Sequence, residues 1–149
     1  MERMLIKDAV IVAGKMKKQG SVLIEDGVIR KIFCEIPELN GVTVYDAQGK
    51  YLVPGFIDIH THGAVMVDVN QADEEGFLKI SKFFATQGTT AWLASILTDT
   101  KEQTYWSIAQ VKKYKEKPRE GAALLGIHLE GPFLAEAFKG AMPIDLLQT

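Results

Sequence analysis

The first third of the chain alternates between short apolar runs and turn residues. The stretch 21–33, SVLIEDGVIRKIF, holds two β-rich runs separated by Asp26-Gly27, a residue pair that favours a tight hairpin turn. The stretch 42–53, VTVYDAQGKYLV, repeats this pattern with a looser Gln-Gly turn. No part of this region has the 3.6-residue periodicity of an amphipathic helix. We therefore predict a small antiparallel β domain over residues 1–53.

From Pro54 onward, apolar strands alternate with amphipathic helices. Thr100 and Gln103 suit a capping box at the start of the second helix, and Pro118 ends that helix. The strand–helix alternation implies parallel strands, as in a doubly wound sheet or a (β/α)₈ barrel. No G-x-G-x-x-G motif follows the first strand, which disfavours a dinucleotide-binding sheet. The predicted elements are a strand at 56–59 buried on both faces, a helix within 73–88, a strand at 89–97, a helix over about 101–117 and a strand at 123–129.

The composition is that of an ordinary soluble globular protein. The chain is 47% hydrophobic and 24% charged, and its net charge of −2 argues against a nucleic-acid partner. Cys34 is the only cysteine, so an intrachain disulfide is excluded and a reducing compartment is expected. The start of the chain does not resemble a signal peptide, and no run approaches the ~20 apolar residues of a membrane span. We expect a cytoplasmic protein without a membrane partner.

Two of the three histidines stand at the end of the strand in PGFIDIHTHG, residues 54–63. Alternate residues of a strand face the same side, roughly 6.5 to 7 Å apart, so His60 and His62 can converge on one ion. Neutral imidazole is the commonest protein ligand for metals, although each histidine could instead make only a hydrogen bond near a turn. Asp58 shares their face and could orient a ligand or make a strand-end hydrogen bond.

The strand at 123–129 leads into a carboxylate. In GIHLEGPF, residues 126–133, His128 and Glu130 share one face of the strand. A carboxylate leaving the core needs a partner, because burying an unpaired charge is costly. A metal ion or an arginine would serve, and so would a salt bridge to another residue. Together with the histidine pair, the pattern favours a metal site built from His60, His62 and Glu130.

These motifs resemble those of a known superfamily. PGFIDIHTHG resembles the first-strand motif of the amidohydrolases, metal-dependent hydrolases built on a (β/α)₈ barrel with a small β-sandwich domain. GIHLEGPF followed by KGAMP, residues 139–143, is similar to the narrower N-acetylglucosamine-6-phosphate deacetylase family. The resemblance implies an α/β fold in which residues 54–149 form the first three strands and two helices of the barrel. Residues 1–53 would form an incomplete β-sandwich-like domain before it.

The resemblance also implies a function and a site. The family hydrolyses the N-acetyl group of an amino-sugar phosphate in amino-sugar catabolism, using a divalent metal, zinc or iron. Glu130 matches the family's carboxylate ligand, and His60 and His62 match first-strand ligands that some members have. Ala141 and Met142 fall where the family has an Ala-His pair that contacts substrate, so Met142 is a departure. The strand at 89–97 departs too, with an alanine where the family usually has proline.

The same resemblance places the catalytic base and two further histidine ligands beyond Thr149. We therefore expect no catalytic residue within these 149 residues, and a chain that is inactive alone. Two other functions stay open: another amidohydrolase acting on a cyclic amide, and a non-catalytic metal-binding remnant. Three parallel strands leave open sheet edges, which favours self-association into a homo-oligomer.

Overall fold

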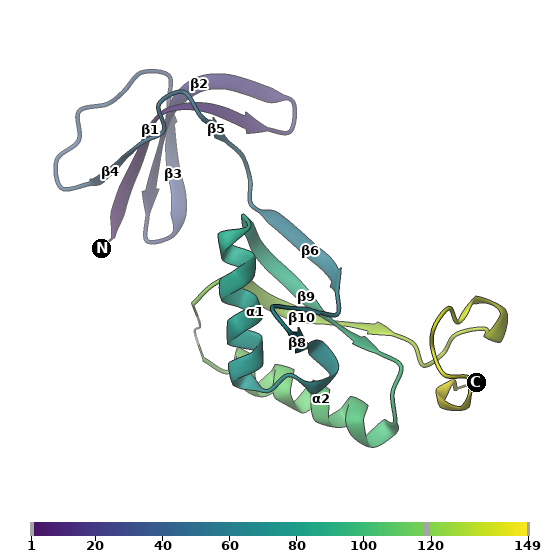
Figure 1. The fold of residues 1–149 in the computed structure, drawn as a ribbon. Helices are drawn as coiled ribbons and strands as arrows, with labels where there is room; N and C mark the ends of the chain where they lie inside the picture. The colour runs from purple at the N-terminus through teal and green to yellow at the C-terminus, as the bar shows by residue number, and fades with distance from the viewer. Residues whose placement is uncertain (1, 118–119, 149) are drawn as a thin grey trace. The chain divides into compact units, whose positions relative to one another are not determined.

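The computed structural model describes residues 2–117 and 120–148. The chain divides into two compact units, Met1–Pro54 and Gly55–Thr149 (Figure 1). Each unit has its own sheet and its own cluster of buried apolar side chains. No helix in the described residues is long and apolar enough to cross a membrane.

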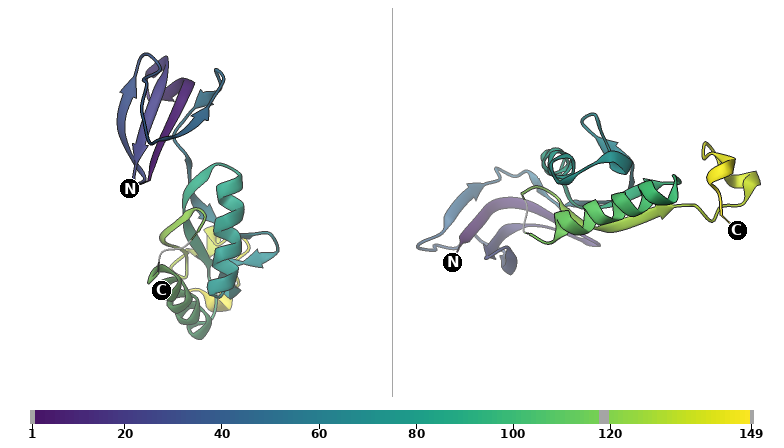
Figure 2. Two further views of the ribbon diagram at one scale, coloured as in Figure 1. Left: turned by 90° about the vertical axis from the view of Figure 1, so that its left-hand side faces the viewer. Right: turned by 90° about the horizontal axis from the view of Figure 1, so that it is seen from below.

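The first unit is a five-stranded mixed sheet, and Figure 2 shows it as strands alone. Its strands are β1 (Arg3–Ala13), β2 (Met16–Glu25), β3 (Val28–Phe33), β4 (Thr43–Asp46) and β5 (Tyr51–Leu52). β1, β2 and β3 pair antiparallel in sequence order. Between β2 and β3, Asp26 and Gly27 both have positive φ, 49° and 75°, as a two-residue hairpin turn requires. The predicted hairpin is confirmed.

The second predicted hairpin of this unit is wrong. β4 and β5 do not pair with each other, because both pair parallel with β1. The segment between them is bound to β1: the Ala47 amide donates to the Lys7 carbonyl and the Gly49 amide donates to the Asp8 carbonyl. The turn therefore carries the chain along the edge of β1 without folding it back. The sheet is mixed where an antiparallel one was expected.

The second unit contains a three-stranded parallel sheet in the order β10-β9-β6. Two helices pack on this sheet and against each other. The alternation predicted from the sequence is confirmed. The elements are β6 (Phe56–Thr61), β7 (Gly63–Ala64), β8 (Val67–Asp68), η1 (Val69–Gln71), α1 (Glu74–Thr86), β9 (Thr89–Leu97), α2 (Lys101–Lys115), β10 (Ala123–Glu130), η2 (Glu136–Phe138) and η3 (Ile144–Leu146).

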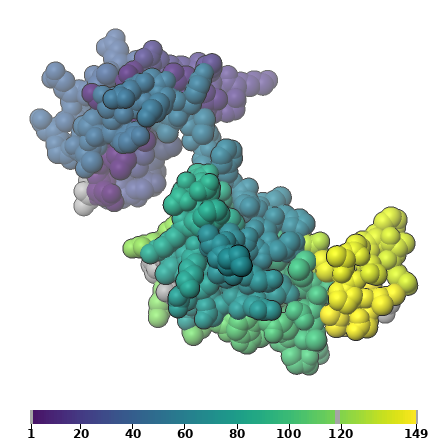
Figure 3. Space-filling model, in the orientation of Figure 1, coloured from purple at the N-terminus to yellow at the C-terminus, as the bar shows by residue number. Residues whose placement is uncertain are grey.

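One face of β9 forms the centre of this unit's core. Trp92 is fully buried among aromatic side chains of α1 and α2, and its indole N–H donates to the Ser81 hydroxyl 3.1 Å away. In Figure 3, α1 forms part of the near surface of this unit. The main members of the cluster are Phe77, Ile80 and Phe84 of α1, Trp92, Ala94 and Ile96 of β9, Val111 and Tyr114 of α2, and Leu124 of β10.

The strand predicted to be buried on both faces is an exposed edge. In β6, the side chains of Phe56, Ile57 and Ile59 are 62–66% exposed. Within the described residues β6 lies at the end of the sheet order and pairs only with β9. The apolar run was correctly identified as a strand, but its predicted burial is wrong. The three strands form an open sheet, so barrel closure is not contained in residues 55–117 and 120–148.

The helix ends follow the predicted signals with two differences. Asp73 caps α1 by accepting from the Gly76 amide, and Thr100 caps α2 by accepting from the Gln103 amide. The capping box is only half formed, because the Gln103 side chain donates to the Asn70 carbonyl instead of returning to the Thr100 amide.

α2 ends at Lys115, two residues before the predicted end. Pro118, predicted to stop it, lies outside the described residues.

Candidate metal centre

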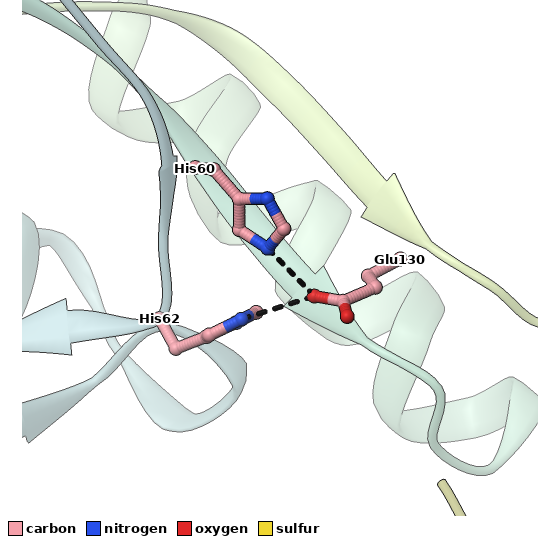
Figure 4. A group of neighbouring side chains, drawn as sticks. All are labelled: His60, His62 and Glu130. Carbon is pink, nitrogen blue, oxygen red and sulfur yellow. Dashed lines mark hydrogen bonds and ion pairs between the residues drawn. The ribbon is translucent and has the colours of Figure 1, made fainter. Parts of the chain in front are cut away.

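His60, His62 and Glu130 meet where two strands of the parallel sheet end. His60 lies near the end of β6, His62 directly follows that strand, and Glu130 is the last residue of β10. Parallel strands present their carboxyl ends at one edge of a sheet, which brings the three side chains together although 70 positions separate His60 from Glu130. Figure 4 shows both imidazole rings directed at the Glu130 carboxylate.

A single carboxylate oxygen is shared between the two rings. Oε2 of Glu130 lies 2.9 Å from Nε2 of His60 and 3.0 Å from Nε2 of His62 (Figure 4). All three potential ligand atoms lie within 4.8 Å of one another. The rings of His60 and His62 stand nearly perpendicular, at 83°. The predicted metal-ligand set is therefore a group of converging side chains in the structure.

The pairing of β6 with β9 shifts register beside the histidines. Asp58 pairs with Trp92 and Thr61 pairs with Ala94, so three steps along β6 oppose two along β9. Such a bulge bends the strand and re-aims its side chains. Asp58 accepts a hydrogen bond from the His60 main-chain amide at 3.0 Å. Of the two roles considered for Asp58, the structure shows the strand-end hydrogen bond.

The hydrogen bond at the far side of the His62 ring fixes its tautomer. Nδ1 of His62 lies 3.1 Å from the main-chain carbonyl oxygen of Ser95. A carbonyl can only accept, so Nδ1 carries the proton and the neutral ring presents the Nε2 lone pair to Glu130. A lone pair and a carboxylate oxygen repel at this distance unless a cation or an added proton lies between them. The donor set is thus suited to a metal ion.

The end of β10 is held by its neighbour strand. The Thr98 hydroxyl donates to the Glu130 carbonyl at 2.8 Å. Gly131 follows with φ of +96°, and a Cβ built there would lie 1.9 Å from the same hydroxyl oxygen. Only glycine accommodates both the backbone angle and this close approach. Gly131, which follows Glu130 in the motif, therefore fixes the point at which the chain leaves the sheet after the Glu130 carboxylate.

Ser95 and His128 lie beside the ligand group, and of these Ser95 was not identified from the sequence. Ser95 is fully buried, and its hydroxyl accepts the Thr61 amide at 3.0 Å. His128 lies with its Nδ1 3.1 Å from that hydroxyl and its ring 4.7 Å from the His60 ring. His128 had been placed on the Glu130 face without a role. The only signal for Ser95 is a small polar residue within an apolar strand.

The two predicted substrate-contact residues lie in the segment after β10. Ala141 is exposed, whereas Met142 is buried and its carbonyl accepts the Lys139 ammonium at 2.8 Å. Within the described residues, neither one joins the three-residue ligand group. A substrate contact at Ala141 and Met142 stays a prediction.

Sequence comparison gives the chain a consistent set of relatives. No family model matches it. It is 32% identical over 145 residues to N-acetylglucosamine-6-phosphate deacetylase from Lysinibacillus sphaericus, covering 97% of the chain and 37% of that relative. It is 35% identical over 152 residues to the enzyme of the same name from Bacillus subtilis, covering 99% of the chain and 38% of that relative. The chain thus spans somewhat more than a third of the length of these relatives.

Solved structures agree with the sequence relatives. The chain superposes with a TM-score of 0.88 on N-acetylglucosamine-6-phosphate deacetylase from Pasteurella multocida, at 23% identity, covering 99% of the chain and 39% of that structure. The deacetylase from Thermotoga maritima gives 0.77 at 28% identity, over 97% and 37%. Dihydropyrimidinase from Brevibacillus agri gives a lower 0.62 at 26% identity, over 91% and 28%.

The fold matches the N-terminal part of hydrolases of the amidohydrolase superfamily. Within that superfamily, the chain matches the N-terminal portion of the N-acetylglucosamine-6-phosphate deacetylases over nearly its whole length.

Proposed function

We propose that this chain forms the metal-binding part of an enzyme that hydrolyses the N-acetyl group of N-acetylglucosamine-6-phosphate in amino-sugar catabolism. The observation that carries the proposal is the convergence of His60, His62 and Glu130 on one point. It is supported by relatives in two bacteria that bear the deacetylase name over almost all of this sequence.

The ion we propose is zinc or iron. Imidazole nitrogen together with a carboxylate oxygen is a donor set that both metals accept. Two neutral imidazoles and one carboxylate contribute a single negative charge, so a divalent ion would keep net positive charge at the site. When bound, such an ion lowers the pKa of a coordinated water to about 7 and polarises an acyl oxygen, which is the chemistry amide hydrolysis needs.

The residues of this chain prepare the site in three ways. The Ser95 carbonyl holds His62 in the tautomer that frees Nε2 for a metal. Asp58 fixes the main chain at His60, and Thr98 fixes the main chain at Glu130. The His62 ring thereby has an outer hydrogen bond of the kind that tunes metal ligands, while the bonds at His60 and Glu130 hold the main chain that carries the other two donors.

The rest of the machinery is proposed to lie in the part of the family's length that this chain does not match. The resemblance assigns the catalytic base and two further histidine ligands to that part. We propose that residues 1–53 contribute to a β-sandwich-like domain and residues 54–149 to the start of a (β/α)₈ barrel. Ala141 and Met142 would face the sugar. On this proposal the chain alone binds metal but releases no acetate.

A graft tests the function directly. Residues 2–148 would replace the matching segment of the Bacillus subtilis relative, and acetate release from N-acetylglucosamine-6-phosphate would be measured after zinc or iron loading. We expect hydrolysis by the graft, and loss of it in a His60→Ala, Glu130→Ala version that still unfolds cooperatively. A folded, metal-loaded graft that opens dihydrouracil but leaves the sugar phosphate intact would instead establish cyclic-amide hydrolysis. Tight metal binding without either activity would identify a non-catalytic metal-binding module.

A further inference from the structure

We propose that Ser95 is the positioning residue of the metal centre, and that its side-chain hydroxyl holds the bulge that aims His60 and His62. This inference rests on the metal-binding part of the proposed function. Ser95 contacts none of the reacting atoms in this scheme. It acts through the strand and the rings that surround it.

Ser95 occupies the centre of the sheet at the level of the site. It lies on β9, the middle strand, and pairs in register with His128 of β10. Its side chain has no exposed surface. Hydrogen bonds reach it from both neighbouring strands: Thr61 of β6 donates its amide to Oγ at 3.0 Å, and Nδ1 of His128 lies 3.1 Å from the same atom. One residue therefore ties together the two strands that carry the candidate ligands.

The Ser95 hydroxyl binds the main chain of β6 at the end of the bulge. Thr61 is opposite Ala94 in the strand pairing, but the bulge before it turns its amide toward the Ser95 side chain. The Thr61 amide is part-buried, and leaving such an amide without a partner is unfavourable, so it favours the bulged path while the hydroxyl is present. Without it, the regular pairing of β6 with β9 regains its advantage.

The bulge decides which side of β6 the histidines face. Side chains alternate along a strand. If β6 paired with β9 without the bulge, every side chain after that point would therefore turn to the opposite face of the sheet. His60 lies within the bulged stretch between Asp58 and Thr61, and His62 follows it. A relaxed strand would therefore separate at least one imidazole from Glu130. The Ser95 carbonyl bond to His62 depends on the same path of the chain.

The second hydrogen bond extends this control to the His60 ring. A hydroxyl has one hydrogen and two lone pairs, so Oγ can accept from Thr61 and still pair with Nδ1 of His128 in either tautomer. His128 packs its ring 4.7 Å from that of His60 at an angle of 59°. Because this hydrogen bond holds its Nδ1, the His128 ring keeps its position and packs against the His60 ring.

Cobalt(II) binding separates positioning from simple stability. Co²⁺ would be titrated into the wild-type chain, Ser95→Ala, Ser95→Thr and the control Ser81→Ala, recording affinity and visible spectrum. Ser81 is equally buried, and its hydroxyl pairs with Trp92 and Tyr114 in the core. Ser95→Ala removes the hydroxyl that holds Thr61 and His128 but keeps the main-chain carbonyl that pairs with His62. We expect it to weaken Co²⁺ binding about 10-fold, at the lower end of the effect of residues outside the ligand set, and to change the spectrum because the ligands are less well aimed.

Ser95→Thr and Ser81→Ala separate the loss of the Ser95 hydroxyl from a general loss of stability. Ser95→Thr keeps the hydroxyl and should retain affinity within a few-fold of wild type, while Ser81→Ala should lower the thermal unfolding midpoint without changing the Co²⁺ spectrum. Wild-type affinity and spectrum in Ser95→Ala would overturn the positioning role while leaving the metal centre standing. If the wild-type chain binds neither Co²⁺ nor Zn²⁺, the proposed metal function fails, and the role of Ser95 in it fails with it.

Discussion

Nδ1 of His62 lies 3.1 Å from the main-chain carbonyl oxygen of Ser95, and this contact defines the chemistry of the opposite ring nitrogen. With its proton committed to the carbonyl, the neutral ring offers a lone pair at Nε2, 3.0 Å from Oε2 of Glu130. Because the acceptor belongs to the main chain, no side-chain substitution deletes it while the strand keeps its path. The site is thus prepared for a cation by backbone geometry as well as by its three side chains.

The first prediction concerns the charge of Glu130. Glu130→Gln keeps the shape of the side chain but removes the negative charge that faces both imidazoles. A ligand that binds only the folded state at 100 times its Kd stabilises it by about 2.7 kcal/mol. We expect Zn²⁺ to raise the unfolding midpoint of the wild-type chain, EDTA to reverse the rise, and Glu130→Gln to lose most of it. Glu136→Gln on η2, an exposed position, is the control. Equal Zn²⁺ shifts in both variants would contradict a role for Glu130.

The second prediction concerns the core of the unit that carries the site. Trp92 is fully buried between α1 and α2, whereas Trp106 on α2 is 40% exposed. Removing a large buried aromatic side chain leaves a cavity and costs about 3–5 kcal/mol. We expect Trp92→Ala to lower the free energy of unfolding by this amount, and Trp106→Ala to lower it much less. Urea denaturation followed by circular dichroism measures both, and similar losses in the two variants would show that Trp92 does not anchor the core.

Much of the second unit could be predicted because its signals are local. The strand at 89–97 was predicted with the bounds that β9 has, and Thr100 caps its helix as its position indicated. The ligand group was predictable for a related reason. Once strands are parallel, residues at their carboxyl ends meet, so His60 and Glu130 could be brought together without knowing the rest of the fold.

Other features depend on contacts between distant segments, which a local pattern does not encode. The turn residues before β5 gave no sign that both β4 and β5 would pair with β1. The apolar run of β6 looked buried, yet its exposure is set by the number of strands beside it. Ser95 could not be recognised because its role arises from a bulge on another strand, at Thr61.

The third prediction concerns Asn70, which fastens the segment after His62 to the end of β9. Its side chain accepts the Leu97 amide at 2.9 Å and donates to the Leu97 carbonyl and to Asp99. Asn70→Asp replaces the donor with an oxygen that faces two acceptors, so we expect a loss of about 1–3 kcal/mol in the free energy of unfolding. Asn40→Asp at an exposed position is the matched control and should change it by less than about 0.5 kcal/mol. An unchanged denaturation midpoint in Asn70→Asp would refute this assignment.

The fourth prediction concerns the ion pair between β1 and β4. The Lys7 ammonium, 3.0 Å from Asp46, and the Gln48 amide both lower the pKa of the Asp46 carboxyl. Because the folded-state pKa is the lower one, the stabilisation is present above the ordinary aspartate pKa and is lost as pH falls through the folded value. We expect Lys7→Met to raise the Asp46 pKa toward its ordinary value in an NMR titration, and Lys50→Met to leave it unchanged. Identical Asp46 curves in wild type and Lys7→Met would rule out the ion pair in solution.

The last prediction concerns the exposed edge of β6. Ile57 is 62% exposed on an edge strand whose outer hydrogen-bonding groups have no neighbouring strand among the described residues. Exposed apolar edges pair readily with other strands, and a lysine on the edge suppresses such pairing because its charge resists burial. We expect the wild-type chain to self-associate at micromolar concentrations in sedimentation velocity, and Ile57→Lys to shift it toward monomer. Ile36→Lys makes the same change at a 56% exposed position outside any strand and should leave association unaltered. A wild-type chain that sediments as a clean monomer would show that this edge does not drive association.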